Sequence, residues 1–155
     1  MSEEKENRGE KETIKLSGEI LFIHRDREGN IIEKDRVKNL IVNKGKEIAA
    51  KLLNGVVTNF FNYIQIGTGT AAPTADDTEL QVYYAEGQAA CSYETDFKAK
   101  WAYTFVFSES VTLTESGIFD GPKSSNPNML ARQTFSGKSV SGGESLEVVW
   151  TITVG

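Results

Sequence analysis

The chain has 155 residues, of which 39% are hydrophobic and 25% charged, with a net charge of -5 and a pI near 5. This is the balance of one soluble domain, and its acidity argues against a nucleic-acid partner, because nucleic-acid binders gather Lys and Arg against phosphates. No apolar run approaches the roughly 20 residues that span a bilayer, so no membrane partner is expected, and the single cysteine excludes an internal disulfide framework.

Residues 1–12 are predicted to form a charged N-terminal arm. They hold five Glu, two Lys and one Arg, with no apolar residue after Met1 and none of the apolar core of a signal peptide. Such a segment cannot bury enough surface to offset its ordering entropy. We therefore expect the arm to become ordered only against a partner, and residues 13–155 to form a single domain.

A β-hairpin is predicted after the arm. Residues 14–25 (IKLSGEILFIHR) have the composition of a strand, in which Gly18 indicates a bulge or a close backbone approach. Residues 26–30 (DREGN) form a turn with Gly29 and Asn30 suited to positive φ, and residues 31–37 return as the partner strand.

One short helix is predicted at about residues 43–54. Asn43 is the expected N-cap, and Gly55 stands where a helix C-terminus favours glycine. Glu47 and Lys51 are spaced for an i, i+4 ion pair. An apolar stripe is expected on the other face, made of Ile48, Ala49, Leu52 and Leu53.

The stretch NYIQIGTGTAAP, residues 62–73, matches the GxGxxA pattern of dinucleotide-binding folds. That pattern works when a helix follows the glycines at once and points its N-terminus at the pyrophosphate. Here Pro73 follows and no helical apolar stripe develops, and a P-loop fails because no Lys follows the second glycine. We predict a strand that ends in a tight loop, with no cofactor.

The rest of the chain predicts short strands. One aromatic face is expected in KAKWAYTFVFS, from Trp101, Tyr103, Phe105 and Phe107, and one apolar face in the last strand, from Leu146, Val148, Trp150, Ile152 and Val154. Between them lie predicted strands at 112–119 and 129–135 and a loop at 120–128. The expected fold is mainly β: an antiparallel β-sandwich or jelly-roll domain with one short α-helix and an extended N-terminal arm.

Sites for chemistry are sparse. His24, the single histidine, has no nucleophile motif beside it and is expected to be a solvated residue at a strand end. Residues 26–30 and the pair Asp76–Asp77 offer oxygen ligands without the spacing of a calcium loop, so no metal is predicted. We expect neither a catalytic centre nor a cofactor.

The aromatic residues allow two interpretations. The face formed by residues 101–107 is expected to belong to the core, the alternative being a platform for stacking sugars. Tyr83, Tyr84 and Tyr93 lie in less regular sequence and are candidates for an exposed aromatic patch. Cys91 is expected to be a small buried residue.

Five segments together resemble a known family. They are NLIVNKGKEIAAKLLNG, FNYIQIGTGTAAPTADDTEL, TESGIFDG, MLARQTF and GGESLEVVWTITVG, within residues 39–155. In this order they resemble small structural proteins of tailed-bacteriophage virions, in which a short helix precedes an "IGTGT-AP" strand and loop and later strands close a β-sandwich. Residues 1–38 carry no such resemblance beyond a variable anchoring region.

The resemblance implies a viral structural protein with no catalytic centre, most simply a capsid decoration, or cement, protein that clamps and stabilises the head shell. Its expected partners are the major capsid protein and copies of itself in a homotrimer on the virion surface, after synthesis in the host cytoplasm. The arm would contact a neighbouring subunit and add a strand there, which makes candidates of Glu3, Glu4, Lys5, Arg8, Lys11, Ile14 and Leu16.

The resemblance leaves one alternative within the virion, a tail-tip or tail-fibre subunit that contacts a host-surface glycan. A carbohydrate-binding module outside any virion has against it the lack of a signal peptide and of a linker to an enzyme. An enzyme has against it the single histidine and the lack of paired metal ligands.

Overall fold

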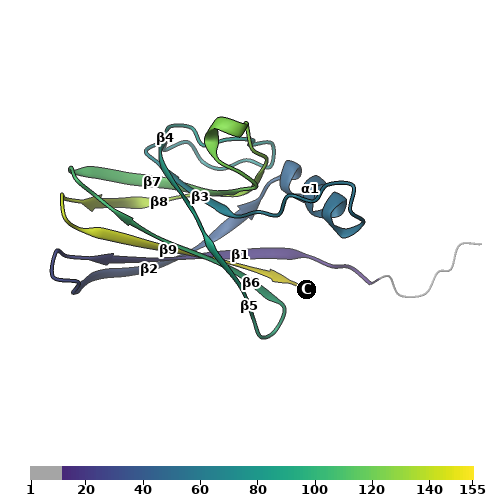
Figure 1. The fold of residues 1–155 in the computed structure, drawn as a ribbon, viewed down its shortest axis with the longest axis horizontal. Helices are drawn as coiled ribbons and strands as arrows, with labels where there is room; N and C mark the ends of the chain where they lie inside the picture. The colour runs from purple at the N-terminus through teal and green to yellow at the C-terminus, as the bar shows by residue number, and fades with distance from the viewer. Residues whose placement is uncertain (1–11) are drawn as a thin grey trace, which may run out of the picture.

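The computed structural model describes residues 12–155, which form nine β-strands, one α-helix and one short 3-10 helix (Figure 1). The mainly β fold with one short helix, predicted from the sequence, is confirmed. The elements are β1 (Leu16–Arg25), β2 (Ile31–Ile41), α1 (Asn43–Leu53), β3 (Tyr63–Gly67), β4 (Tyr83–Gln88), β5 (Ala90–Glu94), β6 (Lys98–Val106), β7 (Val111–Phe119), η1 (Lys123–Ser125), β8 (Met129–Val140) and β9 (Ser145–Val154).

All nine strands belong to one antiparallel sheet in the order β4-β3-β7-β8-β2-β1-β9-β6-β5. The sheet curls until its two ends approach each other (Figure 1). The strands at these two ends, β4 and β5, are consecutive in the chain, so the chain itself crosses the remaining gap between them. The ring of Tyr103 on β6 lies where a Cβ at Gly87 on β4 would stand, so the two ends are in contact. The result is a sheet nearly closed into a barrel.

The hairpin β1–β2 has the predicted position and turn. Gly29 has a φ of +87°, whereas Asn30 has no positive φ. Instead, the Asp26 carboxylate accepts hydrogen bonds from the backbone N–H groups of Glu28 and Asn30. Gly18 is a close approach and not a bulge, because the side chain of Asn39 on β2 occupies the place of its Cβ.

The core lies between the two halves of the curled sheet. The alternation predicted for β6 and β9 is confirmed at most positions, because Trp101, Phe105 and Phe107 are buried, and so are Leu146, Val148, Trp150 and Ile152. Tyr103 is only half-buried, and Val154 is 40% exposed. The buried side chains pack against buried residues of the other strands, among them Ile20, Phe22, Ile64, Leu113 and Ile118. The aromatic face of β6 therefore belongs to the core, and the platform for stacking sugars is not formed there.

Helix α1 begins at Asn43 and ends at Leu53, close to the predicted bounds. The predicted N-cap is wrong: Val42 occupies that position, and the Asn43 side chain instead donates a hydrogen bond to Asp76. The ion pair of Glu47 with Lys51 is present at 3.6 Å, and Gly55 has a φ of +77° just beyond the helix.

The apolar stripe expected on α1 is only partly buried. Ile48 is buried, but Leu53 is 90% exposed. The helix approaches the sheet through Gly45, where a Cβ would overlap the backbone of Leu130 on β8. The contact of α1 with the sheet is therefore made near its N-terminal end, and its last turn leaves an apolar side chain in solvent.

Strands β2 and β8 pair through Leu40 and Ile41 and then diverge (Figure 1). Lys138 of β8 bridges the opening from the inside: its ammonium lies 2.7 Å from Glu33 and 2.6 Å from Asp35, both on β2. Burial opposes the charge, but the hydrogen bonds to Asp35 and Glu33 outweigh it and raise the pKa of Lys138. This ion cluster, in which the ammonium is buried and both carboxylates reach solvent, links the two halves of the sheet where the backbone ladder ends.

In residues 12–155, no helix has the combined length and apolar character needed to cross a membrane.

Candidate functional site

The loop that follows the GxGxxA residues is the most highly organised polar region in the described part of the chain. Strand β3 ends at Gly67, and residues 68–82 contain no helix, as predicted. Neither glycine has room for a side chain: a Cβ at Gly67 would overlap the carbonyl oxygen of Val82, and one at Gly69 would overlap the carboxylate of Glu115. The glycines are needed here for close packing around a carboxylate.

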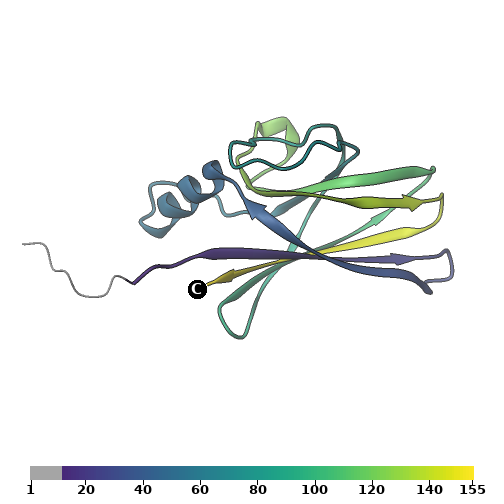
Figure 2. The ribbon, with the colours of Figure 1, turned by 180° about the vertical axis from the view of Figure 1, so that it is seen from behind.

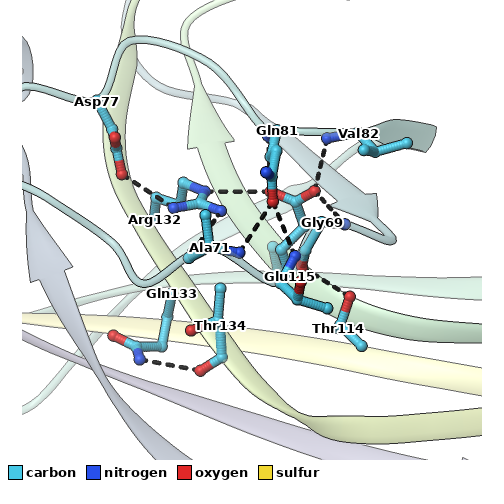
Figure 3. Close-up of polar contacts among 12 residues, drawn as sticks. Gly69, Ala71, Asp77, Gln81, Val82, Thr114, Glu115, Arg132, Gln133 and Thr134 are labelled. Carbon is cyan, nitrogen blue, oxygen red and sulfur yellow. Dashed lines mark hydrogen bonds and ion pairs between the residues drawn. The ribbon is translucent and has the colours of Figure 1, made fainter.

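Glu115 on β7 holds this loop (Figure 3). Its side chain is fully buried. It accepts backbone hydrogen bonds from Gly69 at 2.6 Å, Gln81 at 2.8 Å and Val82 at 2.8 Å. A fourth bond comes from Arg132 Nε at 3.1 Å, so the carboxylate joins both ends of the loop to the sheet.

Arg132 on β8 completes the arrangement, which we call the Glu115–Arg132 clasp. Its side chain is 3% exposed. Beyond Glu115, its guanidinium donates to the Asp77 carboxylate and to the carbonyl oxygen of Ala71, each at 3.0 Å (Figure 3). A buried charge is tolerated only when it is paired and hydrogen-bonded, and both charges of the clasp meet this condition.

A register shift in β7 directs Glu115 toward the loop. Leu113 and Ile118 point into the core, and strict alternation would place Leu113 and Glu115 on the same face. The pairing with β8 shifts between these two positions, from Lys138 opposite Leu113 to Thr134 opposite Glu115. Glu115 therefore lies on the outer face of the sheet, under the loop.

Asp77 belongs to the outer side of the clasp. Its partial burial opposes ionisation, but hydrogen bonds from the Thr74 backbone and hydroxyl and from Arg132 outweigh that effect and hold the pKa of Asp77 below its usual value. The carboxylate is thus ionised and engaged. Asp76 beside it accepts from Asn43, so the two aspartates have different partners.

The clasp is built for holding a loop. Each of its charged groups is engaged by the protein, which leaves neither a free base nor an activated nucleophile at this place. Within residues 12–155 no group of three or more His, Cys, Asp and Glu is placed to hold a metal ion.

Glu115 and Arg132 were not singled out from the sequence. Their signal is a charged residue inside an apolar strand segment, as in MLARQTF and TESGIF. A charged residue buried in this way needs a buried partner, and catalytic motifs contain no signal for such a pair.

Two further sequence predictions about single residues, His24 and Cys91, are wrong. His24 is not solvated: it is 6% exposed, and its Nε2 lies 2.9 Å from the Glu144 carboxylate, because position 24 falls on the core face of β1. Cys91 is not buried: it lies in the exposed strand β5, although partial shielding raises the pKa of its thiol.

The three tyrosines proposed as a patch occupy different surroundings. Tyr83 and Tyr84 are half-buried and bond to Glu86 and Glu109 respectively; burial and the bond to Glu86 raise the pKa of Tyr83 to about 12. Tyr93, on β5, is 70% exposed. The structure therefore leaves only one of the three open to solvent.

Tyr93 has apolar neighbours that were not predicted together with it. The start of β1, the end of β9, the end of α1 and the β5–β6 turn lie at one end of the molecule (Figures 1 and 2). Two open hollows there, of about 580 and 750 Å³, share Ile14 and Val154 as lining residues. We call this the apolar end surface; its exposed members are Ile14, Leu53, Tyr93, Phe97 and Val154.

Phe97 has an unusual backbone in this surface. Its φ is +66°, and that of the preceding Asp96 is +64°. A bulky residue in the left-handed region costs about 1–2 kcal/mol, and such conformations gather where function requires them. Phe97 is nevertheless 69% exposed, so its ring does not compensate by packing inside this chain.

The residues proposed to contact a neighbouring subunit fall in two groups. Ile14 is 69% exposed in the apolar end surface, and Leu16, the first residue of β1, is half-buried. The others, Glu3, Glu4, Lys5, Arg8 and Lys11, lie outside the described residues.

Comparison with protein-family models, with curated proteins and with solved structures finds no match to this chain. The roles of the clasp and of the apolar end surface therefore follow from their geometry alone.

Proposed function

We propose that this protein is a non-enzymatic structural component of a tailed-phage virion, a capsid decoration protein that acts as a homotrimer on the head shell. The observation that carries the proposal is the apolar end surface. In this proposal the nearly closed sheet corresponds to the jelly-roll type of β-sandwich that the resemblance implies, and the arm of residues 1–12 lies on a neighbouring subunit.

The apolar end surface has the composition of a contact between proteins. Five of the eleven large hydrophobic residues exposed in residues 12–155 lie within it. Single exposed apolar residues are ordinary, whereas a contiguous group marks an interaction site. Aromatic side chains such as Tyr93 and Phe97 are enriched at the centre of such interfaces.

The left-handed backbone of Phe97 supports an interface more strongly than the exposure of its side chain does. A glycine at this position would adopt the left-handed backbone without strain. Keeping a phenylalanine there is unfavourable for the isolated chain and useful if the ring is buried against a partner. Strand β5, which carries Tyr93, is also an end strand of the sheet, so its outer edge is available for pairing.

We propose a second copy as the partner at this surface, because closed rotational symmetry repeats one contact between every pair of neighbouring subunits of a ring. The motifs of the resemblance support the virion assignment by a separate argument: Gly69, Glu115 and Arg132, from three separated segments, meet in the clasp. These three motif residues therefore share one structural role, which is to fix the loop of residues 68–82.

Sedimentation velocity over a range of concentrations tests this proposal. The unchanged protein is expected to form a trimer, and the double variant Tyr93→Ser, Phe97→Gly is expected to be a monomer at the same concentrations. Ile32→Ser, an exposed residue of the β1–β2 hairpin at the opposite end, is the matched control and should stay trimeric. A wild-type monomer at all concentrations, or a double variant that still forms trimers, contradicts the proposed interface.

A further inference from the structure

A pocket of about 330 Å³ lies on the outer face of the sheet, away from the apolar end surface. Gln65 of β3 and Phe119 of β7 contribute to it from the sheet, and Lys44 contributes from the first turn of α1. The segment around η1 and the loop between β3 and β4 lie on this outer side (Figures 1 and 2). The volume lies in the range of small-molecule sites.

Gln65 is the observation that points to a ligand. The residue is 1% exposed, yet neither its side-chain oxygen nor its side-chain nitrogen has a hydrogen-bond partner in the protein. A buried amide without partners is unfavourable, and such an exception calls for an explanation. Gly117, opposite on β7, has no side chain, and the carboxylate of Glu86, opposite on β4, accepts hydrogen bonds from Tyr83 and from the backbone of Lys123 and none from Gln65.

The surroundings of Gln65 define the chemistry of the missing partner. Among the residues that line the pocket, Lys44 and Lys123 stand against a single carboxylate, Glu79, while Glu47 and Glu86 lie just outside the lining. Both ammonium groups have exposed glutamate partners, at 2.8 Å from Glu47 and 4.0 Å from Glu79, and such surface pairs are weak enough to be exchanged for a ligand. Neutral hydrogen-bonding groups come from Gln65, Thr78 and Asn128.

We infer that this pocket binds an acidic monosaccharide, a sugar unit that carries a carboxylate or a phosphate. An amide presents one acceptor and a donor group side by side, which suits the paired hydroxyls of a sugar, and the two lysines suit its anionic group. The inference is independent of the proposed virion function, because it concerns another face of the molecule and needs no second copy of the chain.

Titration of ¹⁵N-labelled protein by NMR tests the inference, with glucuronate, glucose 6-phosphate, glucose and inorganic phosphate as separate probes. At least one acidic sugar is expected to bind with a dissociation constant on the order of 1 mM, the affinity that a ligand of this size reaches. Glucose and inorganic phosphate should each bind at least about tenfold more weakly, because glucose lacks the anionic group and phosphate lacks the paired hydroxyls. The shifts should centre on residues 65, 78–79 and 123–128.

Two variants connect binding to the pocket. Gln65→Met removes the buried amide, so it should abolish acidic-sugar binding and raise the thermal unfolding midpoint, because an unpaired polar group is replaced by an apolar one of similar size. Lys123→Gln is exposed, should leave the unfolding midpoint unchanged, and should weaken binding by about tenfold. Lys51→Gln, on α1 outside the pocket, is the control and should bind as the unchanged protein does.

Three results overturn the inference: no saturable binding of either acidic sugar, equal binding of glucose and the acidic sugars, or binding that both Gln65→Met and Lys123→Gln leave unchanged. The first, together with an unchanged or lower midpoint for Gln65→Met, would mean that water alone satisfies the amide. The oligomeric state plays no part in these readouts, so they succeed or fail separately from the trimer experiment.

Discussion

At the scale of single residues, the Glu115–Arg132 clasp carries more interactions than any other buried polar group described above. One carboxylate accepts three backbone N–H groups that no neighbouring strand pairs, and one guanidinium joins that carboxylate to two further points of the loop. Loss of one partner would leave a buried charge and several unpaired donors, which is far more costly than the loss of a surface ion pair.

We predict that Glu115→Gln lowers the free energy of unfolding by about 3 kcal/mol, because an amide nitrogen would face donors where a carboxylate accepted. Urea unfolding followed by tryptophan fluorescence measures this loss. Glu79→Gln, at a side chain that is 73% exposed, is the control and should change stability by less than about 0.5 kcal/mol. Equal effects of the two substitutions would mean that the clasp does not hold the loop.

The pH dependence of the clasp is predicted to come partly from Asp77. The pKa of its carboxylate is lowered in the folded protein, so its contribution is complete above the unfolded value, near 3.8, and is lost as the pH falls through the folded value. The stability difference between the unchanged protein and Asp77→Asn should therefore be constant from pH 7 down to about pH 5 and shrink below about pH 4. Urea unfolding at a series of pH values measures it, and a difference that grows toward acid contradicts the assignment.

At the scale of elements, helix α1 illustrates what the sequence predicts and what it cannot. The i, i+4 spacing of Ile48 and Leu52, together with the glycine at position 55, predicted the C-terminal end of the helix to within one residue. The same pattern predicted burial of Leu53, which is exposed, whereas Leu52 beside it packs against the core. The helix approaches the sheet most closely at Gly45, whose lack of a side chain leaves room for the backbone of Leu130.

We predict that Gly45→Ala destabilises the protein by about 1–3 kcal/mol, although alanine is the better helix former, because its Cβ would overlap the backbone of Leu130. Thermal and urea unfolding measure the effect. Lys46→Ala, at the exposed neighbouring position, is the matched control and should be neutral or slightly stabilising. A stabilised Gly45→Ala variant would show that α1 does not pack against β8 as described.

The turn between β5 and β6 separates stability from association. We predict that Phe97→Gly alone raises the free energy of unfolding of the monomer by about 1 kcal/mol, because glycine adopts the left-handed backbone freely, while it weakens trimer formation. Urea unfolding under dilute, monomeric conditions and sedimentation velocity measure the two effects. A loss of monomer stability would mean that the ring of Phe97 stabilises its own chain.

Strands were easier to predict than single side chains for a physical reason. Alternation in β6 and β9 identifies a buried face wherever strands are regular, and it located the contribution of these two segments to the core. It fails at the register shift of β7, where Glu115 changes face, and at His24, whose position on the core face outweighs the preference of a histidine for solvent. The clasp and the pocket around Gln65 join residues distant in sequence, so pattern alone does not reveal them.

At the scale of the whole molecule, the two candidate surfaces face different surroundings. The apolar end surface, which we propose to be the subunit contact, lies at the end of the molecule where β1 begins. The pocket around Gln65 lies on the outer face of the sheet and shares no lining residue with the apolar end surface, so it would stay open in a trimer formed through that end. A decoration protein arranged this way would meet its neighbouring copies through one end and present the pocket away from that contact.

We predict that deletion of residues 1–12 abolishes binding to purified capsids and leaves the fold intact, because the domain begins at β1 and the arm adds a contact to a neighbouring subunit. Co-sedimentation with capsids measures binding, and circular dichroism with thermal unfolding checks the fold. Undiminished capsid binding by the shortened protein would contradict the role of the arm.

The most direct test of the proposed function is the copy number of this chain in purified phage particles, measured by quantitative mass spectrometry against the major capsid protein. A decoration protein is predicted to be present in a fixed ratio to the major capsid protein, with many copies on every head. A handful of copies per particle would move the chain to the tail tip or fibre, and absence from particles would contradict the virion assignment altogether.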